Sequence, residues 1–149
     1  MDSGQLLAAQ QMRAERIIAM SRHKTRGDLA LEFGATDIVA ERGDAGVSRV
    51  KELTNGIGAD SVLECVGTQE AMTQALQCVR PGGSIGFVGV PHEVALDGET
   101  LFWSQASLQG GPAPVRRFLQ HLMDLVLRRE IGPGKVFDLT LPLADVAEV

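Results

Sequence analysis

Residues 60–90, DSVLECVGTQEAMTQALQCVRPGGSIGFVGV, decide the fold class. Two short apolar stretches, 60–65 and 84–90, flank residues 69–79, in which apolar side chains recur at helical spacing. Thr68 is typical of a helix start, and the turn Pro81-Gly82-Gly83 is expected to end the helix before the second strand. The stretch therefore predicts two strands that pair in parallel through a helical crossover.

The same alternation extends over most of the 149 residues. The expected strands are residues 16–20, 37–40, 60–65, 84–90 and 105–109, and the expected helices are residues 25–33, 44–53, 69–79 and 112–129. Gly34 follows the first of these helices, as a C-terminal cap would. This order predicts a doubly wound α/β fold with a parallel sheet covered on both faces. Because the sequence has no repeat or linker, residues 1–149 are expected to form a single domain.

Composition excludes several classes of protein. The net charge of −5 argues against a nucleic-acid-binding protein, which usually presents a basic face to phosphates. The apolar stretches are too short to cross a membrane and the first residues lack the pattern of a secretion signal, so we expect a cytoplasmic protein with no membrane partner. Cys65 and Cys78 are too few for a disulfide framework and are expected to be reduced.

Both ends of the sequence look cut for such a fold. A doubly wound nucleotide-binding domain opens with a strand in the middle of the sheet, whereas residues 1–13 have helical spacing, and residues 142–149, PLADVAEV, begin a helical pattern and stop. Without that first strand, its two neighbours would have unpaired backbone groups. We therefore expect either that strand 16–20 pairs directly with strand 60–65, or that a second copy of the chain fills the gap.

Four segments carry a resemblance to a known family. They are GATDIVAERG (34–43), GIGADSVLECVGTQEAM (56–72), RPGGSIGFVGVP (80–91) and LQGGPAPVRRF (108–118). Together they resemble the cofactor domain of a zinc-type alcohol dehydrogenase of the medium-chain dehydrogenase/reductase family, over roughly residues 6–149. The resemblance implies a truncated Rossmann-like domain that binds NAD(H) or NADP(H). It also implies that zinc and substrate belong to a separate catalytic domain outside these residues.

A basic turn after the first expected strand points to the form of the cofactor. In dinucleotide folds an acidic side chain at the end of the second strand accepts the ribose hydroxyls of NAD, whereas arginine or lysine pairs with the 2′-phosphate of NADP. Here Met20 is followed by Ser21, Arg22, His23 and Lys24, with no acid at the strand end. This pattern favours NADP(H), with Arg22 as the main phosphate ligand because its planar fork forms two bonds. The alternative is a solvated basic turn at a helix start.

The resemblance implies further cofactor contacts in or directly after three other expected strands. The residues are Cys65, Val66, Gly67 and Thr68 after the strand at 60–65, Val88, Gly89 and Val90 near the nicotinamide carboxamide, and Ser107, Leu108 and Gln109 as the other half of that contact. As alternatives, Val88 and Val90 are core residues of a buried strand, and Gly67 and Gly89 serve only turns or close packing.

The departure from the family pattern concerns the phosphate loop. Rossmann domains hold pyrophosphate with a G-x-G-x-x-G loop between the first strand and the first helix. No such loop precedes Gln5, and Gly56-Ile57-Gly58 comes before a strand and so has the wrong context. We therefore expect the 149-residue chain to lack the Gly-rich loop and to bind NADP weakly or not at all.

No residue set predicts metal binding or catalysis. Cys65, Cys78 and the three histidines lack the spacing of zinc ligands, so no metal site and no zinc are expected. Asp60 and Glu64 are spaced to share one face of a strand, but the resemblance assigns neither a catalytic role. We therefore expect no catalytic residue in this chain.

An aromatic pair suggests an interface. Phe102 and Trp103 stand out in a chain with 4% aromatic residues, beside an expected edge strand. In the family that this chain resembles, the corresponding edge often pairs with its twin, so we expect a possible homodimer through the strand near residues 102–108. The alternative is that both rings pack under the following helix.

Three functions remain open from the sequence. The first is an NADP(H)-binding domain of an alcohol dehydrogenase-like oxidoreductase that is inactive alone. The second is a non-enzymatic remnant that serves as a dimerisation or small-ligand-binding module. The third is a protein with the same α/β scaffold that binds another nucleotide or S-adenosylmethionine. Only analogy at the level of the fold supports this third function.

Overall fold

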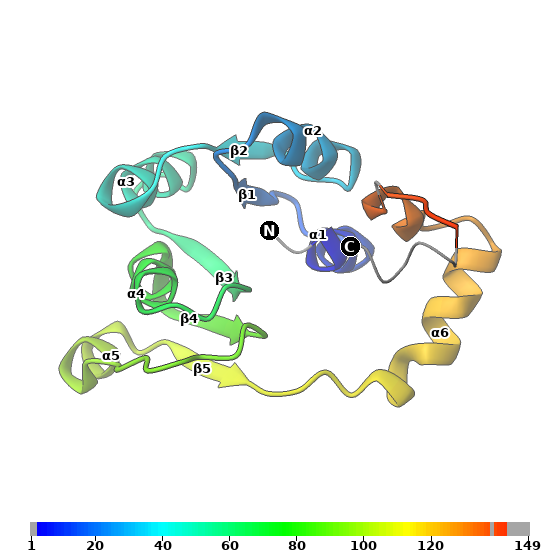
Figure 1. The fold of residues 1–149 in the computed structure, drawn as a ribbon. Helices are drawn as coiled ribbons and strands as arrows, with labels where there is room; N and C mark the ends of the chain where they lie inside the picture. The colour runs from blue at the N-terminus through cyan, green and yellow to red at the C-terminus, as the bar shows by residue number, and fades with distance from the viewer. Residues whose placement is uncertain (1–2, 138, 143–149) are drawn as a thin grey trace. The chain divides into compact units, whose positions relative to one another are not determined.

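The computed structural model describes residues 3–137 and 139–142, which form two compact units, Met1–Ala113 and Pro114–Val149. The first unit alternates helices and strands (Figure 1). Its elements are α1 (Ser3–Gln11), β1 (Ile18–Met20), α2 (Lys24–Glu32), β2 (Asp37–Val39), α3 (Gly43–Leu53), β3 (Ala59–Glu64), α4 (Gln69–Cys78), β4 (Val79–Phe87), α5 (Gly98–Ser104) and β5 (Ser107–Gly110). The predicted α/β class is confirmed. The prediction of a single domain stays a prediction.

The second unit contains helix α6 (Val115–Leu127) and the short 3-10 helix η1 (Pro133–Val136). One side chain of α6, Leu125, is buried. Seven apolar side chains of the helix are exposed: Val115, Phe118, Leu119, Leu122, Met123, Val126 and Leu127. The helical pattern expected from residue 143 onward lies outside the described residues.

All five expected strands are present, and their limits show where tertiary packing overrides local signals. β4 begins at Val79, directly after α4, although Pro81-Gly82-Gly83 was expected to separate helix and strand. Val79 pairs with Ala59, and the register then shifts so that Ser61 pairs with Ser84. The shift accommodates the proline and glycines within the strand.

Helix α5 was not predicted. Its start is set by Asp97, whose carboxylate accepts a hydrogen bond from the Thr100 backbone N–H at 2.9 Å. The Thr100 hydroxyl also donates to this carboxylate, and the hydrogen bonds from the Thr100 hydroxyl and backbone N–H lower the pKa of the Asp97 carboxyl. An aspartate three residues before a threonine is a recognisable capping signal, but the helix has only 7 residues and the aromatic pair dominates its sequence.

The strands form two parallel sheets, β1-β2 and β3-β4-β5. The expectation that strand 16–20 pairs directly with strand 60–65 is therefore wrong, because β1 bonds to β2 and β3 bonds to β4. Side-chain packing joins the sheets instead. Ile18 and Met20 of β1 and Val62 of β3 pack against one buried cluster formed by Val39, Val47, Val50 and Cys78. Whether a second copy lies between the sheets stays a prediction.

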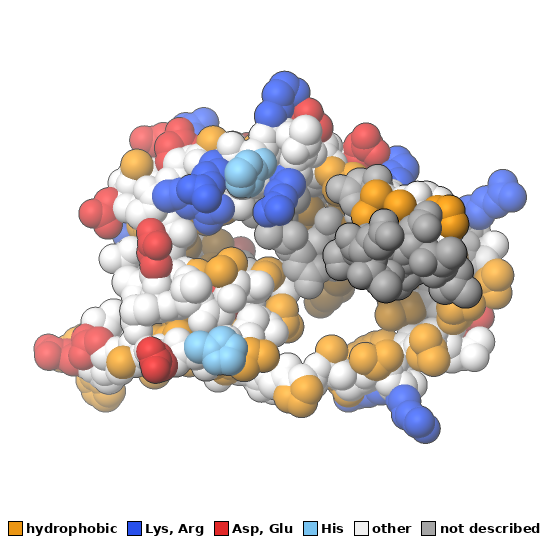
Figure 2. Space-filling view, in the orientation of Figure 1, with side chains coloured by type: hydrophobic (Ala, Val, Ile, Leu, Met, Phe, Trp, Pro, Cys, Tyr) orange, Lys and Arg blue, Asp and Glu red, His pale blue; other side chains and the backbone are white. Residues whose placement is uncertain are grey.

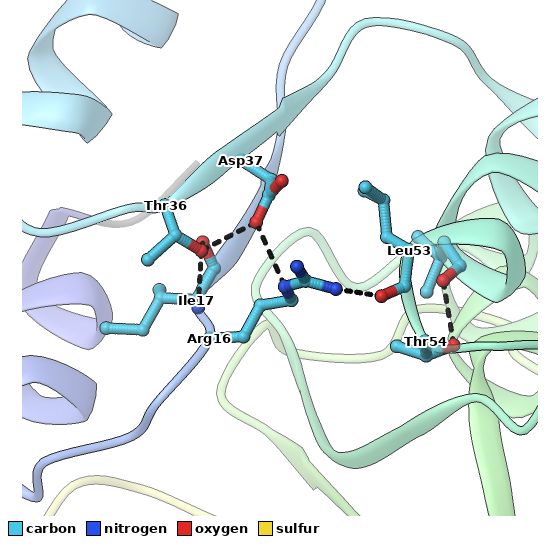
Figure 3. A network of polar contacts seen from close by, with 7 residues as sticks. Arg16, Ile17, Thr36, Asp37, Leu53 and Thr54 are labelled. Carbon is cyan, nitrogen blue, oxygen red and sulfur yellow. Dashed lines mark hydrogen bonds and ion pairs between the residues drawn. The ribbon is translucent and has the colours of Figure 1, made fainter.

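A polar network at the amino end of β1 links this strand to β2 and to the end of α3 (Figure 3). Arg16 Nε lies 3.4 Å from Asp37 Oδ2, and its Nη1 donates to the carbonyl oxygen of Leu53 at the end of α3. Thr36 Oγ1 accepts from the Ile17 backbone N–H at 3.0 Å. Arginine at a helix C-terminus is favourable because it bonds a carbonyl that lacks an intrahelical partner.

Helices cover the sheets in two groups. α1 contacts α2, and α3 contacts α4. A second buried cluster, formed by Ala75, Val79 and Ile85, lies between α4 and the three-stranded sheet. Val62 packs against both clusters, so the core is continuous across β3. Within the described part of the chain, no helix combines the length and apolar character needed to cross a membrane.

Ile85→Ala tests this core. The side chain is 1% exposed, so its truncation is expected to lower the free energy of unfolding by ~2–5 kcal/mol, measured by urea denaturation. Ile57→Ala is the matched control, because Ile57 is 60% exposed and its truncation should change stability by less than about 0.5 kcal/mol. Equal losses in the two variants would contradict the position of the core.

Candidate functional site

Three turns follow the carboxyl ends of strands in the first unit. Residues 21–23 follow β1, residues 65–68 follow β3, and residues 88–90 follow β4. In open parallel α/β sheets, ligands bind just beyond the carboxyl ends of the strands. These turns contain most of the predicted cofactor-binding residues, so the carboxyl ends define the candidate site.

The basic turn after β1 is anchored by Ser21, which is 5% exposed. Its backbone N–H donates to the Val39 carbonyl oxygen at 2.9 Å, and its hydroxyl donates to the His23 carbonyl oxygen at 3.4 Å. Ser21 therefore fixes the turn to β2, while Arg22 and His23 are exposed. The serine positions the turn and presents the two basic side chains to solvent.

Arg22 in the turn and Lys24 at the start of α2 differ in their surroundings. Lys24 begins α2, and its Nζ lies 2.7 Å from Asp28 Oδ2, one helical turn along. Its charge is therefore partly neutralised within the helix. Arg22 has no such intrahelical carboxylate neighbour in the described contacts. Figure 2 shows Lys and Arg side chains on either side of a histidine over β1 and the start of α2.

The start of helix α2 adds partial positive charge beside the basic turn. Its N-cap residue, His23, makes no side-chain capping hydrogen bond. The first backbone N–H groups of a helix lack intrahelical acceptors and carry partial positive charge. The turn and the helix start therefore both favour an anion.

The turn after β3 is held by a buried carboxylate. Glu64 is 4% exposed, and its Oε1 accepts the backbone N–H groups of Val66 at 2.6 Å and Gly67 at 2.9 Å. Two hydrogen bonds to a charged acceptor fix the backbone of this turn. From the sequence, Glu64 and Asp60 were expected to share one face of a strand. In the structure, Asp60 Oδ1 instead lies 2.6 Å from Arg80 Nε. Residue spacing alone did not reveal the anchoring role of Glu64.

Glycines bring the turns after β3 and β4 into contact. Gly67 has φ of +80°, and a Cβ there would overlap the carbonyl oxygen of Val90. A Cβ on Gly89 would lie 2.7 Å from the carbonyl carbon of Val66. The His92 backbone N–H also donates to the Gly67 carbonyl oxygen at 3.3 Å. The packing role considered for both glycines is therefore present, and a contact with cofactor stays a prediction.

The valines near these glycines are exposed. Val66 is 59% exposed, Val88 is 50% exposed and Val90 is 68% exposed. The alternative that Val88 and Val90 are core residues is wrong, because β4 ends at Phe87 and both valines follow it. The two packed turns therefore expose three apolar side chains to solvent.

The remaining predicted residues occupy defined positions. Cys65 is half-buried, and its Sγ contacts Gln5 Oε1 of α1. Thr68 is the N-cap of α4, and its Oγ1 accepts the Ala71 backbone N–H at 3.3 Å. Leu108 packs against the cluster at Ile85, whereas Ser107 and Gln109 lie exposed in β5. Gln5 was not predicted, because a glutamine on a helix carries no signal of a distant contact.

Among residues 3–137 and 139–142, no group of three or more histidine, cysteine, aspartate or glutamate side chains could hold a metal ion. The donor set of a zinc site is therefore not present in this part of the chain. Cys78 is buried, and burial raises the pKa of its thiol. A buried thiol of this kind is a poor metal ligand.

The comparisons with known proteins agree with this geometry. The zinc-binding dehydrogenase family matches residues 4–128. Zinc-type alcohol dehydrogenase B of Aspergillus flavus is 31% identical over 145 residues, covering 96% of this chain and 34% of the relative. NADP-dependent isopropanol dehydrogenase of Thermoanaerobacter brockii is 33% identical over 129 residues, covering 83% of this chain and 37% of the relative.

Solved structures give the same result. Alcohol dehydrogenase TADH from Thermus sp. ATN1 superposes with a TM-score of 0.86 at 30% identity, covering 96% of this chain and 42% of that chain. This chain therefore belongs to the zinc-binding dehydrogenase family and is homologous to the NAD(P)-binding domain of alcohol dehydrogenases. It spans about a third of the length of the curated relatives that it matches.

Gly67→Ala tests the contact between the turns. The left-handed backbone strains any L residue by ~1–2 kcal/mol, and the overlap with Val90 adds a further cost. Gly56→Ala is the matched control, because Gly56 has φ of +82° with nothing within 4 Å of an added Cβ. We expect Gly67→Ala to lower the free energy of unfolding in urea more than Gly56→Ala does. Equal losses would contradict the close approach.

Proposed function

We propose that this chain is the NADP(H)-binding part of an alcohol dehydrogenase-like oxidoreductase. The observation that carries the proposal is the turn after β1, where exposed Arg22 and His23 follow the buried Ser21 and no acidic side chain stands at the strand end. A free cationic side chain at this position complements the 2′-phosphate that distinguishes NADP from NAD.

Arg22 is proposed as the principal ligand of the 2′-phosphate. Its guanidinium offers two parallel N–H donors to one phosphate, and its charge does not depend on pH in the physiological range. Lys24 ranks second because Asp28 already lies 2.7 Å from its ammonium group. His23 ranks third, since neutral imidazole offers a single N–H donor.

The apolar surface of Val66, Val88 and Val90 is proposed to cover part of the nicotinamide ring. These side chains are at least half exposed, and the contact between Gly67 and the turn after β4 brings together the two turns that carry them. Cys65, Gly67, Thr68 and Gly89 are proposed to line the adjoining ribose. Ser107, Leu108 and Gln109 are proposed to complete the carboxamide contact through backbone groups.

Bound nicotinamide dinucleotide supplies or accepts a hydride in exchange with an alcohol or carbonyl compound. The residues of this chain would bind and orient the cofactor and shield its apolar ring. The zinc donors and the substrate contacts would come from polypeptide outside the described residues, so these residues alone are proposed to be inactive, with weak cofactor binding. A cytoplasmic location is part of the same proposal.

The name of one relative supports the choice of cofactor. The isopropanol dehydrogenase of Thermoanaerobacter brockii is described as NADP-dependent, and it is 33% identical over 129 residues. That similarity, together with the basic turn, favours NADP(H) over NAD(H) for this chain.

Calorimetric titration with NADPH and NADH tests the proposal. NADPH is expected to bind more tightly than NADH. Arg22→Ala should weaken NADPH binding about 10- to 100-fold, because a charge-assisted hydrogen bond contributes ~1.5–3 kcal/mol, and should leave NADH binding unchanged. Lys24→Ala is the matched control and should weaken NADPH binding less, because Asp28 shares its charge. Equal binding of the two cofactors, or an Arg22→Ala variant that binds NADPH normally, would reject the proposal.

A second candidate function is a dimerisation module. Phe102 is 73% exposed and Trp103 is 72% exposed, and their rings form an edge-to-face pair with centroids 5.3 Å apart. They lie in α5, next to β5, which ends the three-stranded sheet. Exposed aromatics beside an unpaired strand edge are typical anchors for association, and we propose a second copy as the partner.

Sedimentation equilibrium tests the dimer. The unmodified chain is expected to sediment as a dimer, and Phe102→Ser with Trp103→Ser should shift it to a monomer with an unchanged far-UV circular dichroism spectrum. Val115→Ser is the control, because this valine is also exposed but lies outside the aromatic pair. A monomeric unmodified chain at 100 micromolar would rule out the module.

A further inference from the structure

We propose that a cavity between helix α4 and residues 95–100 binds a small primary amine. The ammonium group of the ligand would pair with Asp97, and its short apolar body would lie against Leu76 and Leu96. The residues that line this cavity do not include those of the basic turn after β1 or of the turns at 65–68 and 88–90. The site is therefore separate from the proposed cofactor site, and the inference does not depend on the proposed function.

The cavity has a volume of about 190 Å³. One wall is a face of α4, and the other is formed by residues 95–97 and by Thr100 of α5. The α4 residues are spaced at i, i+4, i+7 and i+8, which places them on one side of a helix: Gln69, Thr73, Leu76 and Gln77. Because an engineered apolar cavity of about 150 Å³ binds benzene, this volume suits one ring or short chain with a polar group.

Hydrogen bonds through Gln69 hold the two walls together. Its Oε1 accepts the Ala95 backbone N–H at 2.8 Å, and its Nε2 donates to Thr73 Oγ1 at 3.1 Å. Leu76 packs against the second buried cluster, so the helical wall is fixed to the core of the sheet. The cavity is therefore formed before any ligand enters it, which lowers the ordering cost of binding.

Asp97 supplies a negative charge to the cavity. Its carboxylate accepts the Thr100 backbone N–H at 2.9 Å and the Thr100 hydroxyl. These hydrogen bonds lower the pKa of the carboxyl, so it is ionised at neutral pH. A carboxylate has about four acceptor sites, so it can still accept from an ammonium group. The side-chain oxygens of Thr73 and Gln77 line the same cavity and are further acceptors for the ammonium N–H groups.

The surroundings of the cavity favour a cation. Residues 69–79 and 91–104 contain no lysine or arginine, and their acidic residues are Glu70, Glu93, Asp97 and Glu99. Figure 2 shows acidic side chains over α5. A surface of this charge attracts an ammonium group and repels a carboxylate or a phosphate.

The apolar part of the ligand follows from two leucines. Leu76 and Leu96 line the cavity and are half-buried, so each still offers apolar surface to a small molecule. Binding sites for small molecules typically combine such apolar walls with a few polar groups that fix the orientation. An amine with one hydrocarbon group matches both the carboxylate and the leucines.

A nuclear magnetic resonance titration of the 149-residue chain with phenethylamine tests the proposal. The amide signals of Thr73, Ala95 and Thr100 are expected to shift saturably, with a dissociation constant below about 1 mM. Phenylacetate is the matched control ligand, because it has a similar ring and chain but a negative charge. It should bind at least about tenfold more weakly, since it cannot pair with the carboxylate.

A variant pair tests the role of Asp97. Asp97→Asn is expected to weaken phenethylamine binding at least about tenfold, because the charge is lost while asparagine still caps α5. Glu99→Gln is the matched control and should bind normally, because it removes a charge from the same first turn but does not line the cavity. If Asp97→Asn does not fold, Leu96→Ser serves as the second variant, with weakened binding expected from the loss of an apolar wall.

Several results would overturn the proposal. They are the absence of saturable shifts at millimolar phenethylamine, equal binding of phenylacetate, and normal binding by both Asp97→Asn and Leu96→Ser. Shifts confined to Phe102 and Trp103 would assign the amine to the exposed aromatic pair and would also overturn it. A parallel titration with NADPH keeps the two proposals apart, because a chain that binds phenethylamine but not NADPH would reject only the proposed function.

Discussion

Parallel strand pairing is the constraint on which the candidate site depends. β3, β4 and β5 are joined in parallel register, so the turns that follow them leave the sheet at the same edge. The backbone of these turns is then fixed by two specific features. The buried carboxylate of Glu64 holds Val66 and Gly67 by their N–H groups, and the absence of a Cβ at Gly67 and Gly89 allows the turns to touch. The result is a pair of packed turns that expose the side chains of Val66, Val88 and Val90.

The turn after β1 is positively charged, although the whole chain has a negative net charge. The net charge is −5, yet the turn after β1 gathers Arg22, His23 and Lys24. The ion pair between Lys24 and Asp28 satisfies one of these groups within helix α2. Arg22 is exposed, beside a helix start that also favours anions. Arg22 and the start of α2 therefore form a local cationic site on a protein of acidic net charge.

Much of the fold could be predicted because the spacing of apolar residues and the turn residues determine helices and strands through near neighbours in the sequence. All five strands and the helices at α2, α3, α4 and α6 match stretches identified from apolar spacing. The extent of β4 could not be predicted, because the pairing of Val79 with Ala59 depends on a partner 20 residues away in the sequence. The separation of β1 from β3 likewise depends on how Ile18 and Val62 pack against one shared cluster.

The candidate site was predicted less completely than the fold. The basic turn could be predicted because an arginine and a lysine directly after an expected strand are visible in the sequence without knowledge of tertiary contacts. The exposure of Val88 and Val90 was not, because an apolar residue has the same pattern whether β4 ends at residue 87 or at residue 90. The contacts of Glu64 with the turn and of Gln5 with Cys65 depend on tertiary structure, so spacing along the chain did not reveal them.

The central claim is that Arg22 and the turn after β1 recognise a 2′-phosphate. The most direct measurement is a nuclear magnetic resonance titration of the 149-residue chain with adenosine 2′,5′-bisphosphate and, separately, with adenosine 5′-monophosphate, following the Arg22 Nε–H and the Ser21 amide. Both signals are predicted to shift saturably with the bisphosphate and to remain in place with the monophosphate. Equal shifts with the two nucleotides, or shifts confined to residues far from β1, would contradict the account.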